Sequence, residues 1–396
     1  MTASATALRS PDNERTSLPA AHDLAIPVFS PYLGPEVHQA ASDALTAGWL
    51  GMGKLTREFE EELSAYLGLD GRHLVTTSSC TEAIFLSAKV AGIGAGDEVI
   101  CPSFTYVAGH QAISATGADV VFCDVRESDF GIDVASAASM IGPRTKAIMA
   151  VHYAGIPCDL DGVYALAREH RLRVIEDAAH AFGTIHNGRR IGAEGDLTCF
   201  SFGPVKVITS LEGGAIVTSS EEEYIRLQQL RILGVDTDTY ERYKNSRAWV
   251  YDVGQQGYRM HLGSVPAAIG LSQLAKVEEF IENRQEYCRY YNERLAAVPE
   301  LTLPQTDFQD VSPFIYVVRV PDGEVREQFM AHLAAQGIGT GIHFLGAHEF
   351  SFYSKQPRSP LPVTEKLSEQ VVTLPLHPYM TPEVLDRIIQ GITSFF

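Results

Sequence analysis

The sequence predicts an α/β fold, with a mostly parallel sheet covered by helices on both faces and a smaller α/β unit after it. Three observations lead to this prediction. Short β-rich runs alternate with helical stretches from about residue 73 to residue 218. Consecutive strands separated by helices favour parallel pairing, because a parallel neighbour needs a long crossover. The chain has 396 residues, more than one ordinary core holds, so we expect two domains that share a cleft.

The first predicted unit alternates strands and helices in order. The strands are 73–77, 98–101, 119–123, 146–151, 172–176, 197–202 and 214–218, and the helices are 81–90, 106–115 and 160–170. Sheets of this kind bind ligands beyond the carboxyl ends of their strands. The residues that directly follow each strand are therefore the candidate site residues.

Beyond residue 218 the pattern changes. A helical region begins near Ser220, and 235–262, rich in Asp, Tyr and Arg with weak periodicity, is interpreted as a functional loop. The elements expected after it are a helical stretch over 265–297, strands 314–320 and 338–343, a helix at 324–336 and a last helix from Pro382. We predict a large domain over 25–264 and a small C-terminal domain over 265–396. The polar, proline-containing segment 1–24 is interpreted as a disordered tail.

Composition excludes several classes of function. Lysine and arginine total 31 against 49 aspartate and glutamate, a net charge of −18, which disfavours nucleic acid as a partner. No apolar run reaches the length of a membrane span. The six cysteines are scattered without CxxC pairs, which favours buried thiols over a metal site. The amino-terminal residues have no hydrophobic signal core, and we expect a cytoplasmic protein without metal.

Two charged residues follow strands where charge is unusual. Asp177 directly follows the run 172–176, with His180 three residues later, and could be a helix cap, a general base, a metal ligand or the partner of a protonated ring nitrogen. Lys206 lies between an apolar strand and the glycine-rich segment 212–218. Desolvation there would lower its proton affinity and give the nucleophilic amine that Schiff-base chemistry needs, although an exposed loop lysine is the plain alternative.

Two further segments suit one planar, phosphorylated ligand. ThrSerSerCysThrGlu at 77–82 joins a strand to a helix, so the amides around Cys80 and Thr81 would form an anion site or an ordinary helix cap. Tyr106 follows another strand end, where its ring could stack on a cofactor or fill core. Together the signals supply an amine for an aldehyde, a carboxylate for a pyridine nitrogen, a phosphate cradle and a stacking ring, which one cofactor requires.

In this order the motifs SerSerCysThrGluAla, GlyAspGluValIleCysProSerPheThrTyrValAla, GluAspAlaAlaHis, PheSerPhe…Lys and GluGlyGlyAlaIleValThr resemble the DegT/DnrJ/EryC1/StrS family of sugar aminotransferases. The resemblance runs from about residue 26 to the C-terminus. It implies a fold-type-I enzyme that uses pyridoxal 5'-phosphate and works as a homodimer, with each active site at the subunit interface. The expected substrates are L-glutamate and a nucleotide-linked keto sugar.

The resemblance also implies roles for individual residues. Lys206 would bind the cofactor covalently and shuttle a proton, Asp177 would pair with the pyridinium nitrogen, and His180 would lie near the ring and its phenolic oxygen. Tyr106 would stack on the ring. The phosphate would be held by Cys80, Thr81, Ser201 and, from the neighbouring subunit, His261, which stands where the family commonly has asparagine. Arg231 and His343 are substrate contacts by position only.

The chain departs from the family pattern at Val207 and Leu211, where Asn and Gly are usual. GluAspAlaAlaHis and GlyIleGlyThrGlyIleHisPhe at 337–344 look more like enzymes that aminate a 4-keto-6-deoxy sugar than a 3-keto sugar. A related dehydratase, which has histidine at the position of Lys206, and a non-catalytic regulatory homologue are the alternatives. The nucleotide, the sugar, the ring position and the pathway stay open.

Overall fold

The computed structural model describes residues 25–235 and 251–396. The predicted tail over 1–24 and most of the predicted loop over 235–262 lie outside these ranges. The helices are α1 (Pro35–Ala47), α2 (Lys54–Leu67), α3 (Cys80–Val90), α4 (Ala108–Ser114), α5 (Val134–Ser139), α6 (Leu160–His170), α7 (Glu221–Leu230), α9 (Ser264–Leu274), α10 (Val277–Leu295), α11 (Gly323–Ala335), α12 (Pro362–Gln370) and α13 (Pro382–Thr393), with 3-10 turns η2 (Tyr153–Gly155) and η3 (Ala347–Glu349).

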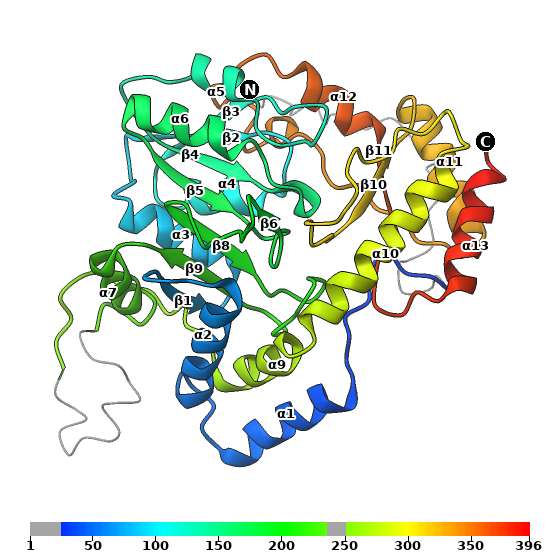
Figure 1. Cartoon of the computed structure of the whole chain (residues 1–396). Helices are drawn as coiled ribbons and strands as arrows, with labels where there is room; N and C mark the ends of the chain where they lie inside the picture. Colours follow the sequence, from blue (N-terminus) through cyan, green and yellow to red (C-terminus); the bar gives the residue numbers. More distant parts are fainter. Residues whose placement is uncertain (1–24, 236–250) are drawn as a thin grey trace, which may run out of the picture.

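The strands form one large sheet and two small ones (Figure 1). They are β1 (His73–Thr77), β2 (Glu98–Pro102), β3 (Asp119–Cys123), β4 (Thr145–Val151), β5 (Arg173–Asp177), β6 (Ile185–His186), β7 (Arg189–Arg190), β8 (Leu197–Ser201), β9 (Gly214–Thr218), β10 (Tyr316–Arg319) and β11 (Val371–Leu374). The large sheet has the order β1-β9-β8-β5-β4-β2-β3. Its strands pair in parallel except at β9, which is antiparallel to both of its neighbours.

The large sheet is buried on both faces, which confirms the predicted α/β fold. Ile148 of β4 and Val174 of β5 pack in a core with α6, whereas Met149 and Ile175 pack in a second core with α3. Side chains alternate between the faces of a strand, so the continuous apolar runs of the sequence supply both cores. Because most of the strands are parallel, their carboxyl ends meet at one edge of the sheet.

The second unit is built on β10 and β11, which pair antiparallel in register from Tyr316↔Leu374 to Arg319↔Val371. The predicted strand 338–343 is wrong. That segment makes only isolated bridges, at Ile338 to Ile26 and at Gly341 to Thr373. The strand that pairs with β10 is β11, which follows α12 without a turn signal in the sequence.

The packing also bears on the predicted division at residue 264, which stays a prediction. Helix α9 and the start of α10, through Ile281, pack in the core with α6, whereas Cys288 and later residues of α10 pack with β10 and β11. The segment that begins at Ile26 also packs with the second unit. The packing therefore favours a boundary inside α10, with the amino-terminal segment assigned to the small unit.

All six cysteines are free and buried, as the sequence led us to expect. In the described part of the chain, no helix has the length and apolar character needed to cross a membrane.

Candidate active site

A cavity of about 380 Å³ opens at the carboxyl ends of β4 and β5, beside the first turn of α3. This is the edge of the sheet at which ligands were expected. Most of the predicted site residues line it, although they come from segments up to 263 residues apart. They are Cys80, Thr81, Tyr106, Asp177, His180, Ser201, Lys206 and His343.

Asp177 is the last residue of β5, and its side chain points to the face of the sheet covered by α3 and α4. Burial raises the pKa of its carboxyl, while the Ala179 amide and the Lys206 amine oppose the rise. The Ala179 N–H donates to Oδ1 at 3.1 Å. One carboxylate oxygen is thereby held, and the other is left for a partner. A buried carboxylate of this kind gains most from a cationic N–H in the cavity, which would keep it ionised.

Lys206 lies in the connection between β8 and β9, where its N–H donates to the Gly203 carbonyl at 3.2 Å. Its side chain is buried in the cavity. Burial lowers the pKa of the amine to about 8, although Cys80, Asp177 and Glu212 act in the opposite direction. Roughly a tenth of the amine is then unprotonated at neutral pH, far more than for an exposed lysine. The amine is therefore suited to attack an aldehyde.

His180 is held in one tautomer by the backbone. The Ala154 N–H donates to Nδ1 of the ring at 3.3 Å, and Ala154 reaches this position in a left-handed conformation with φ of 57°. Burial keeps the pKa of His180 well below its usual range. The ring is thus neutral, with its proton on Nε2, and can donate one hydrogen bond into the cavity.

The cradle for an anion is the start of α3. Ser79 caps the helix by accepting from the Glu82 N–H at 3.2 Å, which leaves the amides of Cys80 and Thr81 at a helix N-terminus. Burial raises the pKa of the Cys80 thiol well above its usual range, so the thiol adds no negative charge. Gly214 of β9 packs directly against the start of α3, since a Cβ at this position would lie 2.6 Å from the Ser79 backbone.

The hydroxyl of Ser201, at the end of β8, lies beside this cradle and lines the same cavity. The connection that follows carries the two departures from the family pattern. Val207 is buried, and Leu211 adopts a φ of 67° and is half exposed. Left-handed backbone favours glycine, which explains physically why glycine is usual at position 211.

Sequence reasoning missed the aromatic wall of the cavity. Phe29, Phe314 and Phe344 come from three distant segments, and no local pattern connects them to the site. Tyr106, 59% exposed, lies at the mouth of the cavity with its ring 5.7 Å from that of Phe344. Glu212 also lines the cavity and was missed, although it opens the glycine-rich segment that drew attention to Lys206.

Of the two other predicted histidines, His343 lines the cavity and His261 does not. Nδ1 of His343 lies 2.8 Å from the Thr373 hydroxyl, and burial lowers the pKa of this ring to about 4. His261 does not line the cavity of its own chain; it is half-buried, and burial lowers its pKa. Its neighbour Met260 accepts from the Ser78 N–H at 2.9 Å, next to the cradle.

Arg231 does not lie where a substrate contact was predicted. Its guanidinium is buried in an ion pair with Glu60, and Nη1 also donates to the Thr76 carbonyl at 2.9 Å. Glu60 in turn accepts from the Thr76 N–H at 2.8 Å. The prediction that Arg231 contacts substrate is therefore corrected, because this side chain fixes the end of β1 below the cradle.

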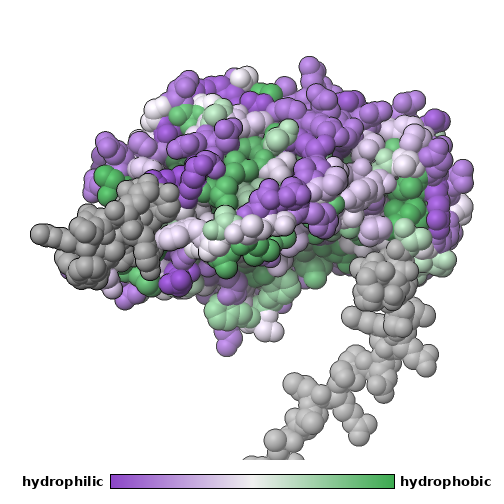
Figure 2. All heavy atoms as spheres, turned by 90° about the horizontal axis from the view of Figure 1, so that it is seen from below, coloured by the Kyte–Doolittle hydropathy of each residue, from purple (hydrophilic) through white to green (hydrophobic). Residues whose placement is uncertain are grey.

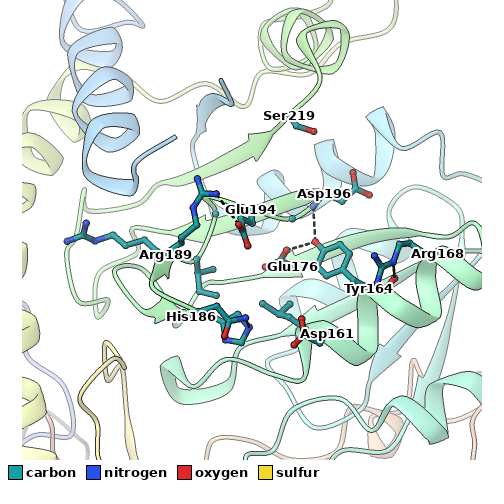
Figure 3. A pocket seen from close by; sticks show the side chains of 15 residues that line it. Asp161, Tyr164, Arg168, Glu176, His186, Arg189, Glu194, Asp196 and Ser219 are labelled. Carbon is teal, nitrogen blue, oxygen red and sulfur yellow. Dashed lines mark hydrogen bonds and ion pairs between the residues drawn. The ribbon is translucent and has the colours of Figure 1, made fainter. Parts of the chain in front are cut away.

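A larger cavity, of about 680 Å³, lies beside α6 and the β6–β7 hairpin (Figure 3). Glu176 lines it and accepts a hydrogen bond from the Tyr164 hydroxyl. Glu176 precedes Asp177 on β5, and its side chain therefore points to the opposite face of the sheet. Nε2 of His152 lies 3.1 Å from the second oxygen of Glu176. None of the described residues that line this cavity is a lysine, so its size alone does not make it the reaction site.

The smaller cavity thus combines a buried amine with a lowered pKa, a buried carboxylate, a neutral imidazole donor and a helix N-terminus. These groups match a planar cofactor that carries an aldehyde, a ring nitrogen and a phosphate. Gly214 supports this fit, because a side chain there would clash with the Ser79–Cys80 backbone that forms the cradle.

Comparisons with known proteins agree with this interpretation. Residues 31–393 match the DegT/DnrJ/EryC1/StrS aminotransferase family. The spore coat polysaccharide biosynthesis protein SpsC of Bacillus subtilis is 34% identical, over 93% of this chain and 96% of that protein. The aminotransferase TlmJ of Streptoalloteichus hindustanus is 32% identical, with a TM-score of 0.86 over 93% of this chain and 98% of that one.

The putative sugar aminotransferase Spr1654 of Streptococcus pneumoniae, solved in its PMP form, is 28% identical with a TM-score of 0.88, over 93% of this chain and 98% of that one. The predicted family and cofactor are thereby confirmed. The chain belongs to the DegT/DnrJ/EryC1/StrS family and is a sugar aminotransferase that depends on pyridoxal 5'-phosphate.

Proposed function

We propose that this enzyme moves an amino group from L-glutamate to a keto-deoxysugar linked to a nucleoside diphosphate, with a 4-keto-6-deoxyhexose as the acceptor. The observation that carries the proposal is the placement of the Lys206 amine, the Asp177 carboxylate and the α3 cradle in one cavity. Pyridoxal phosphate, when bound, supplies an aldehyde for the amino group and a ring that accepts electrons.

Each group of the chain has a distinct part in this reaction. Lys206 binds the cofactor and afterwards moves a proton through its amine, which its lowered pKa permits near neutral pH. Asp177 holds the proton on the ring nitrogen. His180, in the orientation that Ala154 sets, would donate a hydrogen bond from its Nε2 N–H to the phenolic oxygen of the cofactor. The amides of Cys80 and Thr81, with the hydroxyl of Ser201, hold the phosphate.

The walls of the cavity support a deoxygenated sugar. Phe29, Phe314 and Phe344 give an apolar lining, which suits a methyl group better than a hydroxymethyl group. We assign the Tyr106 ring to stacking on the cofactor and His343 to contact with the substrate, because both line the cavity. The 3-keto sugar is the alternative acceptor, since the same lining could receive the ring in another orientation. The Bacillus relative is named for spore coat polysaccharide biosynthesis, which fits an amino sugar as product.

Lys206 is also the observation that disfavours the dehydratase and the non-catalytic homologue. A lysine without a chemical role would be more stable in water, because removing an ammonium group from water costs on the order of several kcal/mol of desolvation free energy. In this chain the amine is buried inside the cavity and faces the groups that the cofactor needs.

We also propose that the enzyme is a cytoplasmic homodimer with residues of both subunits at each site. Leu45 and Leu50 are more than half exposed beside an apolar groove of about 620 Å³ between α1 and α9. Figure 2 shows hydrophobic side chains gathered on the underside, where α1 and α9 lie in Figure 1. A second copy covering this face would bring His261 near the other phosphate cradle, as the family pattern implies.

The proposed dimer is tested by introducing a charged side chain beside the groove between α1 and α9. Leu50→Glu should shift the mass measured by light scattering from two chains to one, because a carboxylate would be buried at the contact. Phe352→Glu is the control, since Phe352 is also exposed but lines neither this groove nor the cofactor cavity. A native protein that is monomeric at micromolar concentration would refute the proposed dimer.

The reaction is tested by absorption spectra of the purified enzyme. Glutamate should convert the yellow cofactor to its aminated, colourless form, and one keto sugar from a panel of 3-keto and 4-keto nucleotide sugars should restore the colour. Product mass and ring position then identify the acceptor. Lys206→Ala should fold and bind cofactor noncovalently without turnover. Full turnover in this variant would remove Lys206 from the mechanism.

A further inference from the structure

The amine of Lys206 lies on the face of an aromatic ring that comes from the other unit of the fold. Its Nζ is 4.0 Å from the centroid of the Phe314 ring. Phe314 is 3% exposed and precedes β10, whereas Lys206 follows β8. A cation at this distance from a ring face is attracted by the negative potential of the ring. The contact is therefore an interaction with the amine as well as apolar packing.

The backbone of Phe314 is fixed on both sides of its own residue. Its N–H donates to the Ala154 carbonyl at 3.2 Å, and its carbonyl accepts from Nη1 of Arg284 at 3.2 Å. Arg284 is fully buried in α10 and donates to the Pro313 and Leu376 carbonyls as well. This guanidinium therefore fixes the backbone at Pro313 and Phe314, and with it the direction of the Phe314 side chain.

The Phe314 ring packs against two other rings. Phe29 stacks on Phe314 with centroids 5.6 Å apart and an interplanar angle of 8°, and His180 lies with its centroid 4.3 Å away. Ala154 joins two of these rings, because its N–H donates to His180 and its carbonyl accepts from Phe314. One left-handed residue thus sets the orientation of both the imidazole and the ring that face Lys206.

The contact affects the two states of the amine differently. Burial disfavours the ammonium form, and the ring face favours it, so Phe314 opposes part of the desolvation of Lys206. A side chain with four rotatable bonds would otherwise sample many positions once it is free of the cofactor. A ring face 4.0 Å away keeps the amine in the cavity, near the carbon to which it must return.

We propose that Phe314 is a positioning residue for Lys206, whose ring face holds the amine inside the cavity whenever the amine is not bonded to the cofactor. The inference rests on the proposed function of Lys206 as the reacting amine. Phe314 does not react; it acts through the lysine.

The test is a pH titration of Lys206 in the cofactor-free protein, monitored by NMR of lysine labelled with ¹³C at Cε. The Lys206 signal is assigned as the one that is lost in Lys206→Met. Phe314→Leu should lower the midpoint by about half to one pH unit, because a partly desolvated contact of this kind is worth roughly one kcal/mol. Phe314→Met also replaces the ring by an apolar side chain and should lower the midpoint by the same amount. This variant is used if Phe314→Leu does not fold.

Phe344→Leu is the matched control. Phe344 lines the same cavity and packs against His180 and Tyr106, so the same substitution should leave the Lys206 midpoint unchanged. A midpoint in Phe314→Leu that equals that of the native protein, or that shifts no further than in Phe344→Leu, would overturn the proposal. That result leaves the function of Lys206 intact, whereas full turnover of Lys206→Ala would refute the function and leave the titration result standing.

Discussion

Replacing Lys206 by methionine should stabilise the cofactor-free protein at neutral pH. Burial lowers the pKa of Lys206 from 10.5 to about 8, which corresponds to about 3 kcal/mol of destabilisation of the charged form. Methionine fills a similar volume without charge. The substitution also removes the contact with Phe314, worth roughly one kcal/mol. The net gain in free energy of unfolding should be about 2 kcal/mol at pH 7.

The gain should depend on pH with a defined sign. Because the pKa is lower in the folded state, the unfolded chain binds more protons between about pH 8 and pH 10.5, and the native protein becomes more stable as pH rises through this window. Below about pH 8 the amine is charged in both states, so the buried ammonium destabilises the folded protein by its full amount. The advantage of Lys206→Met should therefore be constant near neutrality and disappear above about pH 10.5.

The assay is urea unfolding of both cofactor-free proteins at several pH values. Lys355→Met is the control, because Lys355 is exposed and does not line the α1–α9 groove or the cofactor cavity, so its effect should stay within about 0.5 kcal/mol. A Lys206→Met protein that is less stable than the native protein at neutral pH, or a difference that does not change with pH, would refute the reasoning.

Three further outcomes follow from the site. Asp177→Asn should retain bound cofactor but lose about a hundredfold or more in single-turnover rate, since the amide cannot hold the ring proton by charge; an undiminished rate would contradict the assignment. Arg231→Met should cost about 3–5 kcal/mol in urea unfolding, because Glu60 is left buried without its partner. Unchanged stability would show the pair to be dispensable. ¹⁵N spectra should show the His180 ring neutral and protonated on Nε2 well below pH 6.5; a doubly protonated ring would rule out the tautomer.

Local sequence patterns were sufficient for most of the large sheet. Each of its strands was predicted within about two residues, because a strand buried on both faces leaves a continuous apolar run. The small unit was harder. Strand β11 was missed, and 338–343 was predicted as a strand although Gly339 and Gly341 weaken it. A short apolar run has no periodicity that separates strand from coil.

Residues next to a strand end or helix start could be assigned to the site for a related reason. Asp177 ends one strand of the large sheet, Lys206 and the segment at Cys80 follow two others, and the carboxyl ends of parallel strands meet at one edge. The order of the motifs then indicated the family and its cofactor. Arg231 was assigned to the substrate by its position in the sequence alone. The sequence could not show that Glu60 binds its guanidinium.

The sequence by itself determined the fold class, the family and the cofactor, because these depend on patterns within a few residues of each strand. Only the tertiary structure decided the tautomer of His180, the aromatic wall and the contact between Lys206 and Phe314. The tautomer of His180 is set by Ala154, 26 residues away, whereas the aromatic wall and the contact of Lys206 join segments more than 100 residues apart, such as Phe29 and Phe314. Side chains this far apart in the sequence are brought together by packing of the two units, which no local pattern records.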